Sequence, residues 1–117
     1  MSKTILINGA KLHYNDTETD LPAIVTLHGA PGMSNSSGDW RVYADLADRY
    51  RIISYDQRGS GSSEQIAPFS FEQFCADLEE LRRKLDLGKI VIAGGSYGGM
   101  IALQYVTRFQ HNLPAVV

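Results

Sequence analysis

Short, nearly continuous apolar runs recur along this chain and are separated by polar turns. Residues 23–27 (Ala-Ile-Val-Thr-Leu) and 51–55 (Arg-Ile-Ile-Ser-Tyr) are two such runs, and residues 89–93 (Lys-Ile-Val-Ile-Ala) are a third. A strand that is buried on both faces has this pattern, because neither side of its pleat meets water. The three runs therefore predict strands in the middle of a sheet.

Between these runs the apolar positions recur with a helical period of about 3.6 residues. Ser70 precedes the clearest case and is expected to cap it, with Gln73 completing a capping box. Asp39 is expected to cap a short helix that runs through residues 46–47, and residues 99–106 predict one more helix. The apolar stripe of the helix after Ser70 consists of Phe71, Phe74, Cys75, Leu78, Leu81 and Leu85.

At the N-terminus, residues 4–7 and 11–14 flank Asn8-Gly9, a dipeptide that favours a tight hairpin. Residues 113–117 resemble the start of a further strand. Strands that alternate with helices indicate an α/β fold, here a mostly parallel sheet with an antiparallel N-terminal hairpin and flanking helices. No repeat or linker divides residues 1–117.

Composition narrows the classes of function without naming one. The chain has 117 residues, a formal net charge of −2 and a single cysteine, Cys75. This charge shows no excess of basic residues of the kind that binds nucleic acid or an anionic membrane. The apolar run at the N-terminus is too short for a signal peptide, and no stretch approaches the length of a transmembrane helix. A lone buried thiol suits a reducing compartment, so we expect a cytoplasmic protein.

The most informative motif is Gly94-Gly95-Ser96-Tyr97-Gly98, which lies between the third apolar run and a predicted helix. A G-x-S-x-G motif at a strand–turn–helix junction is typical of a nucleophile elbow. Ser96 is therefore the candidate nucleophile, and the backbone N–H of Tyr97 is a candidate oxyanion donor. The alternative is a structural glycine-rich turn.

A second loop, residues 28–32 (His-Gly-Ala-Pro-Gly), follows the first buried strand. Its Ala30 N–H is the candidate for the second oxyanion donor, with Gly29 less favoured. The alternative is a tight Pro-Gly turn without a catalytic role. His28 precedes Ser96 in the chain, and we expect it to order its own loop by hydrogen bonding rather than to act as the general base.

The remaining polar residues suggest structural roles. Asp56 is expected to cap a turn and Arg58 to brace the loop that contains both. His13 and His111 are expected to be surface or structural residues. No metal cluster, Walker loop or dinucleotide fingerprint occurs, so no cofactor is expected. Four acidic residues are expected on the solvated side of the helix after Ser70: Glu72, Asp77, Glu79 and Glu80.

Three motifs in this order resemble the α/β-hydrolase superfamily: residues 28–32, residues 56–63 (Asp-Gln-Arg-Gly-Ser-Gly-Ser-Ser) and residues 94–99. Within it they look most like proline iminopeptidases. The resemblance implies that Ser96 is the nucleophile and that Tyr97 and Ala30 supply the oxyanion N–H groups. It gives supporting places to His28, Gly29, Gly94 and Gly98. A serine at position 96 speaks against epoxide hydrolases and dehalogenases, which need an aspartate there.

The resemblance also implies a triad acid, a histidine and a helical cap, which members of the family carry beyond the elbow. After Ser96 this chain has one histidine, His111, and no Asp or Glu. It therefore resembles the N-terminal half of such an enzyme. We expect it, once completed, to cleave an N-terminal residue from a small-molecule or short-peptide substrate through an acyl-enzyme, and to turn over little by itself.

Two other interpretations remain open. A carboxylesterase or a lactonase has similar loops. A non-catalytic, truncated module would instead self-associate through an open sheet edge beside residues 90–93, with a second copy as its partner.

Overall fold

The computed structural model describes residues 2–30, 32–109 and 115–116. Within these ranges six strands form one sheet in the order β1-β2-β4-β3-β5-β6. The strands are β1 (Ser2–Ile7), β2 (Ala10–Asp16), β3 (Ala23–Leu27), β4 (Arg51–Tyr55), β5 (Ile90–Gly94) and β6 (Ala115–Val116). The helices are α1 (Ser37–Tyr43), the 3₁₀ turn η1 (Ala44–Leu46), α2 (Phe71–Lys84) and α3 (Tyr97–Phe109).

The N-terminal hairpin joins a parallel sheet. β1 pairs antiparallel with β2, and the turn between them is Asn8-Gly9, with φ of 47° and 86°. Positive φ at both turn residues is what a two-residue hairpin of type I′ requires. β2 then pairs antiparallel with β4, while β4, β3, β5 and β6 run parallel. The predicted α/β fold with an N-terminal hairpin is confirmed.

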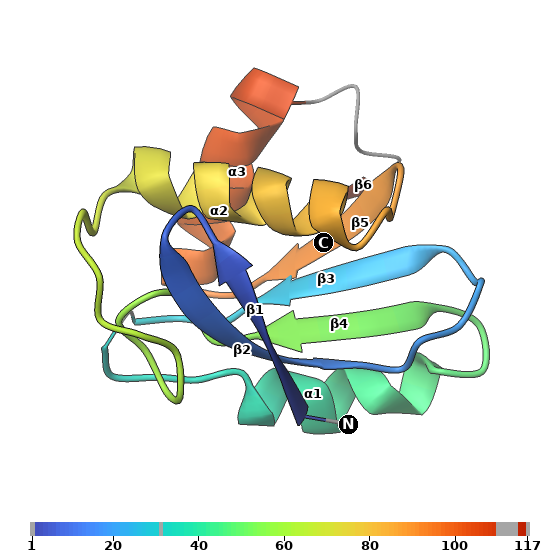
Figure 1. Cartoon of the computed structure of the whole chain (residues 1–117). Coiled ribbons are helices and arrows are strands. Elements are labelled where there is room, and N and C mark those ends of the chain that lie inside the picture. The colour runs from blue at the N-terminus through green and yellow to red at the C-terminus, as the bar shows by residue number, and fades with distance from the viewer. Residues whose placement is uncertain (1, 31, 110–114, 117) are drawn as a thin grey trace.

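Helices cover both faces of the sheet (Figure 1). α1 lies on one face, where Ile24 and Ile52 pack with Trp40. α2 and α3 lie on the other face, over a larger core that contains Val25 and Leu78. Neighbouring residues of β3 thus point to opposite faces, as the pleat demands, and both faces are covered. This explains why the sequence of β3 is a nearly continuous apolar run, in which the hydroxyl of Thr26 donates to the Ser54 Oγ.

The parallel strands all end at the same edge of the sheet. In Figure 1 the arrowheads of β3, β4 and β5 point to the left, and the loops after them gather there. These are the loops at residues 28–30 with 32–36 and at residues 56–70, and the turn at residues 95–96 between β5 and α3. In open α/β sheets ligands bind at this carboxyl edge. The two glycine-rich motifs and the elbow therefore share one end of the molecule.

One prediction about α2 is wrong. Asp77 was expected on its solvated side, but it is only 1% exposed and pairs with Arg58. The apolar stripe is where it was predicted, and the Ser70 Oγ accepts the N–H of Gln73 at 3.1 Å. The capping box is only half formed, because the Gln73 side chain donates to Asp77 instead of turning back to Ser70.

Helix bounds also differ from expectation at two places. α1 begins at Ser37 after the N-cap residue Ser36, so Asp39 lies in the first turn and is not the cap. Burial raises the pKa of the Asp39 carboxyl, and nearby His28 partly opposes this. α3 begins at Tyr97, two residues before the predicted start, because the turn at Ser96 leads straight into the helix.

The C-terminal expectations are tested only in part. β6 pairs in parallel with Val91 and Ile92, as a further strand next to β5 would. His111 lies outside the described residues. None of the helices in the described part of the chain is both long and apolar enough to cross a membrane.

Candidate active site

Ser96 lies in the sharp turn between β5 and α3. β5 ends at Gly94 and α3 begins at Tyr97, so only Gly95 and Ser96 connect them. The φ of Ser96 is +55°, in a region that L residues adopt rarely and at an energetic cost. Ser96 is exposed, and within the described ranges its Oγ makes no hydrogen bond. The turn thus presents a free hydroxyl at the carboxyl edge of the sheet.

The glycines around Ser96 are required by close packing. A Cβ built on Gly98 would lie 2.1 Å from the carbonyl oxygen of Leu27, and one on Gly94 would lie 2.6 Å from the carbonyl oxygen of Gly98. Both distances are shorter than any real contact, so a side chain at either position would push β5, α3 and β3 apart. Gly95 differs, since a Cβ there meets nothing within 4 Å. Gly94 and Gly98 therefore set how tightly the helix turns back against the sheet.

The loop after β3 lies directly against the elbow. Leu27 is the register partner of Gly94, so the two strands end together. A Cβ built on Gly29 would be 3.3 Å from the Ser96 Cβ and 3.7 Å from its Oγ. The structure therefore brings together the two loops that were singled out independently in the sequence.

The two candidate oxyanion donors have suitable surroundings. Tyr97 is the first residue of α3, where backbone N–H groups have no partner within the helix. Its ring packs against α2, stacked on Phe71 at 4.8 Å. Ala30 is exposed and has φ of +23°. In the described part of the chain neither N–H has an acceptor, so both are available to a developing negative charge.

His28 is buried, and both of its ring nitrogens have partners, one in its own loop and one in the loop after β4. The Gln57 N–H donates to its Nε2 at 3.0 Å, and its Nδ1 lies 2.7 Å from the Gly29 carbonyl oxygen. The side chain of Gln57 also donates to the His28 carbonyl at 2.9 Å. The contacts are those that a loop-ordering residue would make, and neither ring nitrogen is left to accept a proton from Ser96.

Asp56 is a turn cap, as predicted. It accepts the N–H groups of Ser36 at 2.7 Å and Ser62 at 3.0 Å, and His13 Nδ1 lies 3.1 Å away. Burial pushes its pKa upward, but the hydrogen bonds from Ser62 and Ser36, with a smaller effect of His13, hold the pKa below its ordinary value. His13 thus has the structural role expected of it.

Arg58 braces the same loop. Its guanidinium contacts both oxygens of Asp77, at 2.6 and 2.9 Å, and also donates to the carbonyl groups of Ile66 and Asn8. Arg58 is only 1% exposed. The loop after β4 is thereby tied to α2 and to the hairpin, and the Arg58 charge is neutralised inside the protein.

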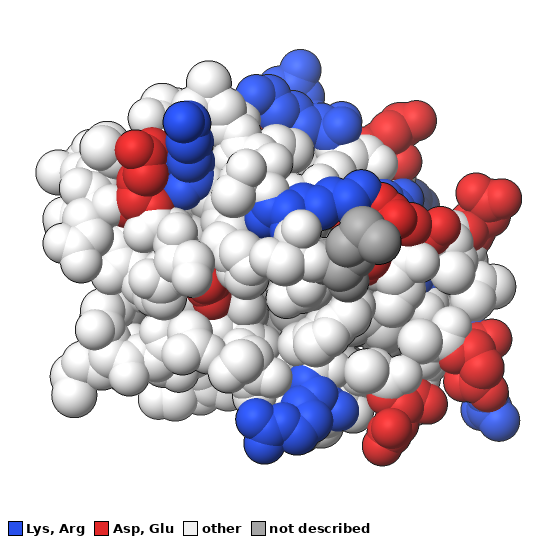
Figure 2. All heavy atoms as spheres, turned by 60° about the horizontal axis from the view of Figure 1, so that its bottom comes forward, with Lys and Arg blue, Asp and Glu red and all other residues white. Residues whose placement is uncertain are grey.

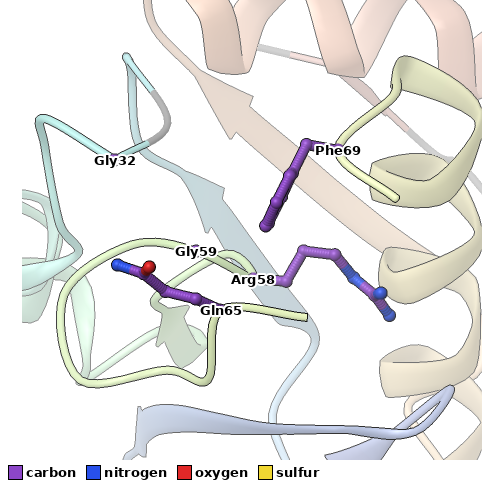
Figure 3. Close-up of a pocket in the computed structure, with 5 residues that line it drawn as sticks. All are labelled: Gly32, Arg58, Gly59, Gln65 and Phe69. Atoms are coloured by element: carbon purple, nitrogen blue, oxygen red, sulfur yellow. The ribbon is translucent and has the colours of Figure 1, made fainter. Parts of the chain in front are cut away.

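A cavity of about 300 Å³ opens next to these loops, between Gly32 on one side and Gly59 and Phe69 on the other. Figure 3 shows the Phe69 ring projecting into this space while the Arg58 guanidinium points away from it. Gln65 is the remaining lining residue. The accessible lining is therefore glycine backbone, an aromatic ring, the Arg58 stem and one amide, which suits an uncharged group.

The surface around the cavity is mainly uncharged. Figure 2 shows few Lys, Arg, Asp or Glu atoms at the left of the molecule, where these loops lie, and more at the right. Three large apolar side chains are exposed here: Met33 at 90%, Phe69 at 53% and Ile66 at 39%. An exposed apolar surface around a pocket marks an interaction or ligand site.

Sequence reasoning missed two residues of this region. Gln57 was not singled out, although it is 1% exposed and makes both contacts with His28. Phe69 was not expected to line a cavity. Gln57 belongs to the motif at residues 56–63, but nothing local signals its contact with His28, which lies 29 residues away. Nothing local places Phe69 at the cavity either.

Known proteins with similar sequences include a proline iminopeptidase and a putative chloroperoxidase. A proline iminopeptidase of the fungus Pestalotiopsis fici is 36% identical to this chain over 120 aligned residues, which cover 100% of the chain and 43% of the relative. A putative non-heme chloroperoxidase of Synechocystis is 35% identical over 84% of the chain and 35% of that protein. The chain thus spans less than half the length of these relatives.

Solved structures share the fold. A proline iminopeptidase-related protein from Thermus thermophilus superposes with a TM-score of 0.91 at 24% identity, covering 99% of this chain and 42% of that one. The family model for the alpha/beta hydrolase fold matches residues 22–117. This match covers most of the chain, including the elbow and both flanking loops. The chain belongs to the α/β-hydrolase fold family.

Proposed function

We propose that Ser96 is the nucleophile of a serine hydrolase of the proline iminopeptidase type, which removes an N-terminal residue through an acyl-enzyme. The observation that carries the proposal is the exposed Ser96 hydroxyl, held at φ of +55° against Gly29 of the neighbouring loop. Ser96 would attack the scissile carbonyl. The N–H groups of Tyr97 and Ala30 would stabilise the oxyanion that forms.

The activity requires more than these residues supply. Ser96 needs a general base, and the described part of the chain offers none in hydrogen-bond contact with it. Several curated relatives are named proline iminopeptidases, and the chain covers 43% and 40% of two of them. We propose that the acid, the base and the cap come from sequence equivalent to the rest of these relatives.

The cavity next to Gly32 supports a substrate with an uncharged, apolar part. Gly32 lies three residues after Gly29, so their Cα atoms are at most about 11 Å apart. A substrate attacked by Ser96 would need to extend only about this far beyond Gly29 to place one end in the cavity. The Arg58 charge is neutralised by Asp77, so nothing in the lining favours an anion.

The proposal is tested by substrate choice. The chain is assayed alone and mixed with the C-terminal part of the Pestalotiopsis fici relative, using prolyl 4-nitroanilide, its N-acetylated form and 4-nitrophenyl acetate. We expect the mixture to cleave the anilide that has a free amine, and Ser96→Ala to abolish this. Cleavage of the acetate alone would favour a carboxylesterase, the first alternative. Turnover that is unchanged by Ser96→Ala would contradict the proposal.

A non-catalytic, self-associating module is the second candidate. Among the described residues, β6 pairs in parallel with Val91 and Ile92 of β5. In this candidate function a second copy would pair with an exposed strand edge of the sheet. Sedimentation that shows a strictly monomeric chain would exclude it. Under either function a cytoplasmic location remains our proposal, since Cys75 is a free, buried thiol.

A further inference from the structure

The ring of His28 connects the two loops at the carboxyl edge of the sheet. The Gln57 N–H donates to Nε2, and Nδ1 lies 2.7 Å from the carbonyl oxygen of Gly29. A backbone N–H can only donate, so Nε2 must accept and the ring proton resides on Nδ1. His28 therefore donates to the Gly29 carbonyl.

That carbonyl shares a peptide unit with the candidate oxyanion donor. The C=O of Gly29 and the N–H of Ala30 belong to one planar group, and in a trans peptide they point in opposite directions. The Ala67–Pro68 bond is the cis peptide among the described residues, so the Gly29–Ala30 unit is trans. Fixing the Gly29 carbonyl toward His28 thus fixes the Ala30 N–H in the opposite direction.

The Ala30 conformation needs such support. Its φ of +23° is unfavourable for an L residue, and Ala30 is exposed, so its own burial cannot hold it. Met33, further along the same loop, is 90% exposed and adds no packing. The Ala30 carbonyl accepts the N–H groups of Met33 and Ser34, both at 2.9 Å, which holds the peptide after Ala30. The peptide before Ala30, which carries the Ala30 N–H, is held by the polar contacts of His28 to Gly29 and to the loop after β4.

We propose that Gln57 and the His28 ring form a hydrogen-bond relay that sets the direction of the Ala30 N–H, which makes both of them positioning residues of the oxyanion hole. The effect of the relay on catalysis rests on the proposed function of Ser96. The hydrogen bonds that make up the relay do not depend on that function. The sequence of contacts is Gln57 N–H to His28 Nε2, His28 Nδ1–H to Gly29 C=O, and then the Ala30 N–H of the same peptide.

The Gln57 side chain makes a further contact that keeps Gln57 next to His28. Its Nε2 donates to the His28 carbonyl, while its Oε1 is buried without a partner among the described residues. An amide is needed here for its donor, since the oxygens of a glutamate would face the His28 carbonyl oxygen. Further along, Gly32 N–H donates to the Ser60 Oγ at 2.8 Å and fixes the far side of Ala30.

Two substitutions at His28 separate the relay from general loop packing. An asparagine amide places a donor close to where Nδ1 lies, whereas a glutamine amide reaches the place of Nε2. His28→Asn therefore keeps the donor to Gly29, and His28→Gln keeps only the group that faces Gln57. His13→Gln is the matched control, because His13 is structural and lies outside the relay.

Two measurements are made on the full chain. NMR reads which His28 ring nitrogen carries the proton and the chemical shift of the Ala30 amide. Mass spectrometry reads the rate at which a fluorophosphonate labels Ser96, with free imidazole supplied as the base. One lost oxyanion donor typically costs about 10²–10³ in kcat, so a misdirected one should cost at least about tenfold.

In the unsubstituted chain we expect the His28 ring proton on Nδ1. In His28→Gln we expect a shifted Ala30 amide resonance and labelling of Ser96 that is slowed about tenfold or more. In His28→Asn and His13→Gln both changes should be smaller. A ring proton on Nε2, or equal effects of the two His28 variants, would overturn the relay. The ring proton is read in the unsubstituted chain, so the inference remains testable if a variant fails to fold. If Ser96 of the unsubstituted chain takes no label, the proposed function fails, and the NMR results still decide the relay.

Discussion

Arg58 and Asp77 form a bidentate ion pair in which each residue is only 1% exposed. Asn8 and Gln73 also donate to Asp77, so its charge has several partners. The pair joins the loop after β4 to α2, and that loop in turn holds His28 through Gln57. A buried ion pair far from Ser96 in sequence thereby supports the candidate active site.

Removing one member of this pair should destabilise the fold strongly. Arg58→Met or Asp77→Leu alone leaves an unpaired buried charge, which costs about 3–5 kcal/mol, whereas the double variant should recover most of the loss. Urea unfolding measures each free energy. The exposed pair Arg83–Glu80 is the control, and Arg83→Met should change stability by less than about 1 kcal/mol. A double variant no more stable than the single ones would contradict this account.

The glycines of the elbow should differ in their tolerance of alanine. Gly98→Ala places a Cβ 2.1 Å from the Leu27 carbonyl oxygen and should destabilise by about 1–3 kcal/mol or more, although alanine favours helix. Gly95→Ala meets nothing within 4 Å and should leave stability nearly unchanged. Thermal unfolding compares the two. Equal shifts of the midpoint would show that the elbow is less tightly packed than described.

Asp56 should make stability depend on acid. Burial raises the pKa of the Asp56 carboxyl, but the hydrogen bonds that it accepts outweigh this and lower the pKa in the folded state. The ionised Asp56 therefore stabilises the folded protein at pH values above the unfolded pKa of about 3.9. This contribution is lost as the pH falls through the lower folded pKa. Asp56→Asn should therefore be less stable at pH 7 and lose less stability between pH 5 and 2. Urea unfolding across this range checks it, with exposed Asp45→Asn as the control; a parent-like pH slope in Asp56→Asn would contradict the assignment.

Cys75 should be inert in the folded protein. It is buried, and burial raises the pKa of its thiol to about 11, with Arg108 partly opposing the rise. Because the thiolate is the reactive form, Ellman's reagent at pH 8 should react only after unfolding in urea. A Ser62→Cys change in a Cys75→Ala chain provides an exposed comparison and should react at once. Fast reaction of Cys75 without urea would mean that α2 opens readily.

The sequence was sufficient to predict the strands and the elbow, because their signals are local. Residues 23–27 and 51–55 are nearly continuous apolar runs, and both are strands. Ser96 is placed by glycines within its own motif. The role of Asp77 could not be found this way, since an acid on a helix is usually solvated and its partner lies 19 residues away. The Gln57–His28 contact is equally invisible, because it exists only once β3 and β4 lie side by side.

The central claim is that the elbow makes Ser96 more reactive than other serines of the chain. The most direct test is the intact mass after treatment with a fluorophosphonate in the presence of imidazole, followed by mapping of the adduct. The account predicts a single adduct on Ser96, absent in Ser96→Ala, with exposed Ser37 and Ser62 unlabelled. Adducts spread over Ser37 and Ser62, or none on Ser96, would contradict it.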